Sequence, residues 1–166
     1  MADKSTFTAD EWKTLLESVM AAGLAVTAAE PSGLFGLLQE SFAGGKMLAK
    51  AKMDAASNPV IKAVVDDLAT SEGRSASRDG LQQALTGKKP GEMTAACLEI
   101  LGKANDILSA KAPGDADAFK TWLRQISQSV AEAATEGGFL GIGGVAVSDA
   151  EKATLAEISS ALKLPG

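Results

Sequence analysis

The chain has 166 residues, of which 46% are hydrophobic, 22% charged and only 4% aromatic, and its net charge at pH 7 is -5. A chain of this length forms one domain, and the acidic balance disfavours nucleic acid and polyanionic membrane surfaces, because no basic face is available for phosphates. With no histidine, no tyrosine and one cysteine, the chain has no intrachain disulfide, no serine–histidine or cysteine–histidine catalytic pair and no zinc site of cysteine and histidine.

The first predicted helix begins at a capping box formed by Thr8 and Glu11, whose side chains have the spacing to bond each other's backbone amides. It should end near Ala29, because Pro31 disfavours helical geometry at Glu30. Its inward face is predicted from apolar or small side chains that recur every three or four residues: Trp12, Leu15, Leu16, Val19, Gly23 and Val26.

Two further helices are expected before residue 70. An apolar pattern over 34–53 predicts the second, with a break or kink where Gly44 and Gly45 weaken it. The third begins with Asn58 as N-cap and Pro59 at the first helical position, and it buries Val60 or Ile61, Val64, Val65 and Leu68. The polar, serine-rich segment 70–80 is predicted to be a loop or the start of a short helix ending at Gly87.

Three more helices are expected in the C-terminal half. The first follows the break at 87–92 and stops before Pro113, the second starts near residue 115, and the last begins where Ser148 and Glu151 repeat the capping-box spacing. Seven helices are therefore predicted. Their inward residues are Met93, Cys97, Ile100, Leu101, Ala104 and Leu108, then Phe119, Trp122, Leu123, Ile126, Val130 and Ala133, then Leu155, Ile158 and Leu162.

The first and sixth predicted helices overlay with a shift of about 107 positions. The shift pairs Trp12 with Phe119, Leu15 with Trp122, Leu16 with Leu123, Val19 with Ile126 and Val26 with Ala133. A glycine-containing turn follows each helix. We therefore expect an all-α, single-domain bundle with two pseudo-symmetric helix-loop-helix units, at about 8–56 and 115–164, joined by central helices at about 58–111.

The last predicted helix carries a pattern of three residue pairs, Glu151-Lys152, Glu157-Ile158 and Ala161-Leu162. With this pattern the C-terminal unit resembles the TerB-like tellurite-resistance family, whose last helix carries a similar one. The resemblance implies an all-helical, internally duplicated protein that works by binding, with a role in stress response by analogy. The single cysteine and an N-terminus without an apolar signal region favour a cytoplasmic location.

The family's loops gather carboxylates for divalent cations, and this chain departs from that pattern. Thr135-Glu136-Gly137 stands where an Asp-Gly turn is expected, and few acids follow. The resemblance therefore implies at most a degenerate site for calcium or another divalent cation, and no other cofactor is expected. Its candidate ligands are Glu136, Asp149 and Glu151, with Glu30 and Glu40 behind them.

The segment 137–147 combines five glycines with bulky apolar residues. It lacks the spacing of a phosphate-binding loop and is too short to span a membrane. Either its apolar side chains cap the bundle, or a protein partner or a second copy covers them, or they enter a lipid interface. The candidate partner-binding residues are Phe139, Leu140, Ile142 and Val145.

The sequence predicts a binding protein and not an enzyme, because no histidine or tyrosine is available for acid–base chemistry near neutral pH. The alternative is a structural or assembly protein that docks through segment 137–147. An enzyme would need a pocket with two close carboxylates. Asp66 and Asp67 are adjacent on a helix and point about 100° apart, so we interpret them as a solvated face and not as a chelating pair.

Overall fold

The computed structural model describes residues 2–28, 49, 53, 58–136 and 149–165, and this part of the chain is all-helical, without strands. The predicted fold class is therefore confirmed at the level of an all-α bundle. A short 3-10 turn, η1, comes first, and six α-helices follow: η1 (Lys4–Thr6), α1 (Ala9–Ala28), α4 (Pro59–Leu68), α5 (Ser71–Leu85), α6 (Pro90–Lys111), α7 (Pro113–Glu136) and α8 (Asp149–Ala161).

Most helix ends lie where the sequence predicts them. Thr8 and Glu11 form the predicted capping box, with the Thr8 amide donating to Glu11 Oε2 at 2.8 Å and the Glu11 amide donating to Thr8 Oγ1 at 3.2 Å. Asn58 caps α4, and α6 ends before Pro113. The helix predicted over 34–53 lies outside the described residues except for Ala49 and Met53, which are helical, so the count of seven stays a prediction.

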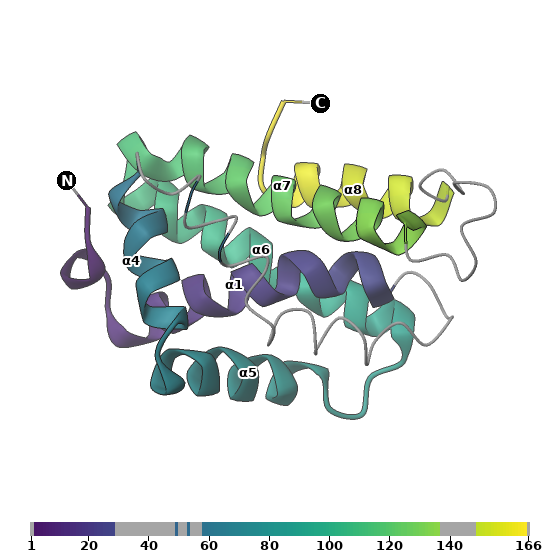
Figure 1. Ribbon diagram of the computed structural model, residues 1–166, viewed down its shortest axis with the longest axis horizontal. Coiled ribbons are helices and arrows are strands. Elements are labelled where there is room, and N and C mark those ends of the chain that lie inside the picture. The colour runs from purple at the N-terminus through teal and green to yellow at the C-terminus, as the bar shows by residue number, and fades with distance from the viewer. Residues whose placement is uncertain (1, 29–48, 50–52, 54–57, 137–148, 166) are drawn as a thin grey trace.

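Helix α1 lies at the centre of the bundle, between α5 on one side and α7 and α8 on the other, with α6 alongside it and α4 crossing near its N-terminal end (Figure 1). Its C-terminal half is buried on every face, since only Leu24 keeps a half-buried position between Ala21 and Ala28. A helix that is apolar all round belongs in a core. Its small side chains let the neighbouring backbones approach closely.

Two serine hydroxyls join the outer helices to α1. Ser77 of α5 donates to the carbonyl of Leu16 at 3.0 Å, and Ser127 of α7 donates to the carbonyl of Ala22 at 2.7 Å. All four residues are buried, so each hydroxyl is satisfied inside the core. These bonds hold α5 and α7 at short distance from the central helix.

Of the two alternatives predicted for segment 70–80, the loop is wrong, and the start of a helix that ends near Gly87 is confirmed. Helix α5 covers this segment, and Thr70 caps it by accepting a hydrogen bond from the Gly73 amide at 3.0 Å. The buried side of α5 is made of small residues, Gly73, Ser77 and Gly80, ahead of Leu81. Serine and glycine lower helix propensity, but here Ser77 and Gly80 fit a close contact with α1, and Gly73 fits one with the end of α4. The chain leaves this helix at Gly87, whose φ of 77° suits glycine.

The described helices share one hydrophobic core, which includes most of the predicted inward residues. Trp12 and Trp122 are each 4% exposed and Cys97 is fully buried, as predicted. Phe7 packs on Trp12 with ring centroids 5.8 Å apart, and Phe119 meets Trp122 edge-on at 5.3 Å. Met93 is only half-buried. In the described parts of the chain, no helix has the length and apolar character that crossing a membrane requires.

Candidate functional site

The acidic residues predicted as metal ligands are not brought together where the structure describes them. Asp149 begins α8, is fully exposed and pairs with Lys152 at 3.8 Å, whereas Glu151 is 4% exposed. Residues two positions apart on a helix point in nearly opposite directions, so these two carboxylates cannot bind one ion together. Glu136 is the last residue of α7, with its side chain outside the described part, and Glu30 and Glu40 also lie outside it.

Among residues 2–28, 49, 53, 58–136 and 149–165, no group of three or more Asp, Glu, Cys or His side chains is close enough to hold a metal ion. The predicted partner-binding residues Phe139, Leu140, Ile142 and Val145 lie outside these ranges. Docking through segment 137–147 therefore stays a prediction.

Asp66 and Asp67 have different environments. Asp66 is exposed, as the solvated-face interpretation predicts. Asp67 is not part of such a face, because its Oδ2 accepts hydrogen bonds from Trp12 Nε1 at 2.7 Å and from Lys4 Nζ at 2.9 Å. Partial burial alone would raise the pKa of Asp67, but the two hydrogen bonds and the charge of Lys4 together lower it. Asp67 therefore joins η1, α1 and α4.

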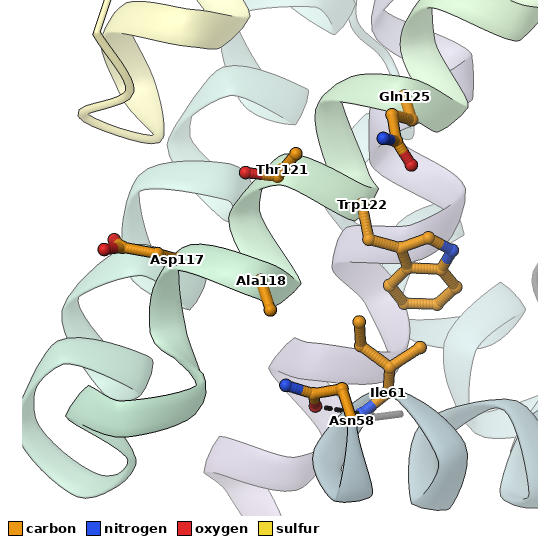
Figure 2. Close-up of a pocket in the computed structure, with 7 residues that line it drawn as sticks. All are labelled: Asn58, Ile61, Asp117, Ala118, Thr121, Trp122 and Gln125. Carbon is orange, nitrogen blue, oxygen red and sulfur yellow. Dashed lines mark hydrogen bonds between the residues drawn. The ribbon is translucent and has the colours of Figure 1, made fainter. Parts of the chain in front are cut away.

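A cleft of about 370 Å³ lies where the N-terminus of α4 faces α7 (Figure 2). Two residues come from the start of α4, and five come from one side of α7, where they recur at intervals of three and four. The lining residues are Asn58, Ile61, Asp117, Ala118, Thr121, Trp122 and Gln125. This volume is at the small end of the range for ligand pockets, which is about 300–1,000 Å³.

The floor of the cleft is apolar and fixed in place. Figure 2 shows the Trp122 ring lying over the Ile61 side chain. Both residues are almost fully buried, and the edge-on contact of Phe119 holds the indole from within α7. An aromatic ring and a branched aliphatic side chain give the floor a rigid shape, and only a small area of each is exposed to the cleft.

Asn58 forms the α4 side of the cleft and is held by three hydrogen bonds. Its Oδ1 accepts from the amides of Val60 at 3.1 Å and Ile61 at 3.0 Å, which caps the helix, and its Nδ2 donates to Asp115 Oδ1 at 3.2 Å. The residue is 9% exposed. These bonds tie the first turn of α4 to the first turn of α7, so the two sides of the cleft keep a fixed separation.

Three polar groups on α7 have no hydrogen-bond partner among the described residues: the indole N–H of Trp122, the hydroxyl of Thr121 and the amide of Gln125. Trp12 differs, because its indole N–H donates to Asp67. Asp117 is also on the rim, 93% exposed, and pairs with Lys120 Nζ at 3.1 Å. The cleft therefore combines an apolar floor with one donor-only group and two groups that both donate and accept.

Sequence reasoning assigned Trp122 to the core and Asn58 to a helix cap, and both assignments are confirmed. It missed that the two residues border a cleft. The available signal was the pattern on α7, where Ala118, Thr121 and Gln125 place small or polar side chains beside a tryptophan. The same pattern occurs on an ordinary helix where its buried side meets its exposed side. Only the packing of α4 against α7 shows that a cleft lies here.

The chain was compared with protein-family models, with curated proteins and with solved structures, and none of them matches it.

Proposed function

We propose that the chain is a TerB-like helical binding protein that holds a small ligand in the cleft between α4 and α7 and does not catalyse a reaction. The observation that carries this proposal is the combination of the Trp122 and Ile61 floor with polar groups of α7 that lack partners among the described residues. These groups are in contact with solvent, so a ligand would replace water as their hydrogen-bond partner. The rigid walls reduce the ordering that binding requires.

The chemistry of the lining supports binding over catalysis. The chain has no histidine or tyrosine. The carboxylate in the lining, Asp117, is exposed and already paired with Lys120. Acid–base catalysis by two carboxylates requires both at one bond of the substrate, and Asp117 has no second carboxylate beside it in the lining.

The proposed kinship includes seven helices and two related helix-loop-helix units. Burial at paired positions supports the duplication: Trp12 with Phe119, Leu15 with Trp122, Leu16 with Leu123 and Val19 with Ile126 are all buried. The fifth pair, Val26 with Ala133, has one side chain outside the described residues. Helices α1 and α7, which carry these pairs, also pack against each other.

Nuclear magnetic resonance can test the cleft directly, because the chain has only two tryptophans. Each gives one indole N–H signal, which the Trp12→Phe variant assigns. A mixture of neutral, cationic and anionic fragments should contain compounds that shift the Trp122 signal. The Trp12 signal should stay in place, since its N–H is bonded to Asp67 outside the cleft.

A matched pair of variants provides the control. Ala118→Phe places a large side chain in the cleft and should abolish the shifts, whereas Ala153→Phe makes the same change at an exposed position of α8 and should preserve them. If no fragment shifts the Trp122 signal more than the Trp12 signal, the proposed function is wrong.

A further inference from the structure

Arg124 of α7 differs from the other cations that the structure describes. Most of the described lysines and arginines form an ion pair with Asp or Glu. Arg124 forms none in the described part of the chain, and neither do Lys62, Arg74, Lys88 and Lys89. Those four are exposed and hydrated, whereas Arg124 is half-buried. A cation that loses part of its hydration without gaining an anion raises the free energy of the folded state.

Two hydrogen bonds hold the guanidinium of Arg124 in the seam between α7 and α8, which pack side by side (Figure 1). Its Nε donates to Ser159 Oγ of α8 at 2.9 Å, and its Nη1 donates to Gln128 Oε1, one turn further along α7, at 3.1 Å. The Ser159 hydroxyl donates to the carbonyl of Leu155 at 3.1 Å, which orients the oxygen that accepts from Arg124. Both acceptors are neutral, so they fix the guanidinium without compensating its charge.

One end of the guanidinium keeps unused donors. Nη2 makes no hydrogen bond with the residues that the structure describes, and Nη1 has a second N–H group. Nη1 and Nη2 together form the end of a planar fork, which binds two oxygens of one anion through parallel hydrogen bonds. Partial burial lowers the pKa of Arg124, because the charged form loses hydration, but the group stays ionised near neutral pH.

The neighbouring lysines limit the charge of the anion. Lys120 is four positions before Arg124 and therefore lies on the same side of α7, but it already pairs with Asp117 at 3.1 Å. Lys163, just beyond the end of α8, pairs with Asp106 at 3.6 Å. Arg124 therefore contributes the uncompensated positive charge of this seam. A monoanion balances that charge, whereas a dianion adds a negative charge to a chain whose net charge is already -5.

A purely structural role does not account for the charge of Arg124. A neutral side chain that donates to Ser159 would join α7 to α8 with a smaller loss of hydration. We infer that Arg124 anchors a second binding site, which takes the carboxylate group of a small monocarboxylic acid in the seam between α7 and α8. The site is separate from the cleft between α4 and α7, whose lining does not include Arg124, and it does not rest on the function proposed for that cleft.

Nuclear magnetic resonance tests the site with an internal control, because the chain has three arginines, Arg74, Arg78 and Arg124. Each gives one Nε–H signal, and the Arg124→Lys variant assigns the signal of interest. Acetate is titrated into the full chain at constant ionic strength against chloride. The Arg124 signal should reach half of its full shift at a concentration at least about tenfold lower than the signals of the two exposed arginines, since hydrogen bonds to charged groups are strong where the donor is fixed.

Two further probes separate charge from shape. Acetamide has nearly the same shape as acetate without the charge, and it should bind at Arg124 at least about tenfold more weakly. Sulfate offers several oxygens but carries a double negative charge, so it should also bind more weakly than acetate.

A matched pair of serine variants tests the positioning of the guanidinium. Ser159→Ala removes the acceptor of Nε and should weaken acetate binding at Arg124 by about two- to tenfold, because the fork is no longer held in place. Ser160→Ala makes the same change at the next position of α8, which is exposed, and should leave the affinity unchanged.

Three results would overturn the inference. If acetate shifts all three arginine signals over the same concentration range, Arg124 is no more than an ordinary surface cation. If acetamide or sulfate binds as tightly as acetate, the site does not select a monocarboxylate. If Ser159→Ala binds acetate as Ser160→Ala does, the seam does not position Arg124. The Trp122 signal takes no part in these measurements, so their outcome is distinguishable from that of the test of the cleft.

Discussion

Asp67 connects three parts of the fold through one carboxylate oxygen. It accepts hydrogen bonds from Trp12 and Lys4, and the Lys4 ammonium also lies 5.8 Å from the Trp12 ring centroid. Asp67→Ala leaves the indole N–H without its partner and should lower the free energy of unfolding by about 1–3 kcal/mol. Urea denaturation measures the change.

The neighbouring exposed residue is the matched control for this prediction. Asp66→Ala should change stability by less than about 0.5 kcal/mol, because the residue is exposed. The lowered pKa of Asp67 also implies that its contribution is present above the ordinary pKa of aspartate and is lost as pH falls through the lowered value. Equal effects of the two variants would contradict the role of Asp67 as a connection.

Glu17 shows the opposite electrostatic situation. Burial raises the pKa of its carboxyl group, and the charges of Lys13 and Lys103 offset only part of that effect. The carboxylate packs over Gly80 of α5, where a Cβ atom would collide with it. The folded chain binds this proton more tightly than the unfolded chain does. The free energy of unfolding therefore decreases as pH rises from the ordinary glutamate pKa through the raised value.

Glu17→Gln should remove that pH dependence. Relative to the unmodified protein, the variant should become more stable as pH rises from about 4 to 7, by less than about 1 kcal/mol, because the lost pairing with Lys13 offsets part of the gain. Denaturation at several pH values measures this difference. The control is Glu157→Gln, at an exposed position of α8, whose stability should change with pH as that of the unmodified protein does. If the stability of Glu17→Gln changes with pH in the same way as that of the control, the prediction is wrong.

At the scale of the helix, replacing glycine by alanine should have opposite effects on stability at two positions with different surroundings. A Cβ at Gly73 would collide with the backbone carbonyl of Asp67, whereas a Cβ at Gly102 of α6 meets nothing within 4 Å. Gly73→Ala should destabilise the protein by roughly 1–3 kcal/mol, because backbone cannot move aside. Gly102→Ala should stabilise it by about 0.5–1 kcal/mol through helix propensity. Thermal denaturation measures the change in stability of each variant. If both variants are more stable than the unmodified protein, α5 is not closely packed at Gly73.

Helix prediction from sequence was definite where local chemistry decides the structure, and it left two alternatives open where packing decides it. The capping box of Thr8 and Glu11 and the Asn58 cap each act within one turn, so residue spacing was enough to find them. Helix α5 has the same local signal in Thr70, but its buried side is glycine and serine, which a search for apolar periodicity does not detect. Only the close contacts with α1 and with the end of α4 make those small residues favourable.

At the scale of the molecule, one core joins the described helices, and both tryptophans belong to it. Each single-tryptophan variant, Trp12→Phe or Trp122→Phe, should therefore give the same midpoint by fluorescence and by far-ultraviolet circular dichroism, because small domains with one core unfold in one step. Parallel urea titrations measure the midpoints. A fluorescence transition that precedes the loss of helix in either variant would indicate that α1 and α7 belong to separate folding units.

The cleft is a property of the whole fold, which explains why the sequence did not predict it. Asn58 and Trp122 are 64 positions apart, and neither residue carries a motif that points to the other. The predicted acidic ligands illustrate the converse problem. Asp149 and Glu151 are close in sequence, but on α8 their side chains point in nearly opposite directions, so Asp149 is exposed and Glu151 is buried. Proximity along a helix was a poor guide to proximity in space.

The low reactivity of the chain's single thiol follows from the buried position of Cys97 in α6. Cys97 has no exposed surface, and burial raises its pKa to about 12, so an alkylating reagent meets neither an accessible sulfur nor a thiolate while the core is closed. Labelling can proceed only from molecules in which α6 has come away from its neighbours, and each molecule can react once. The rate of alkylation of Cys97 therefore measures how often the native state opens spontaneously, and no engineered probe is needed.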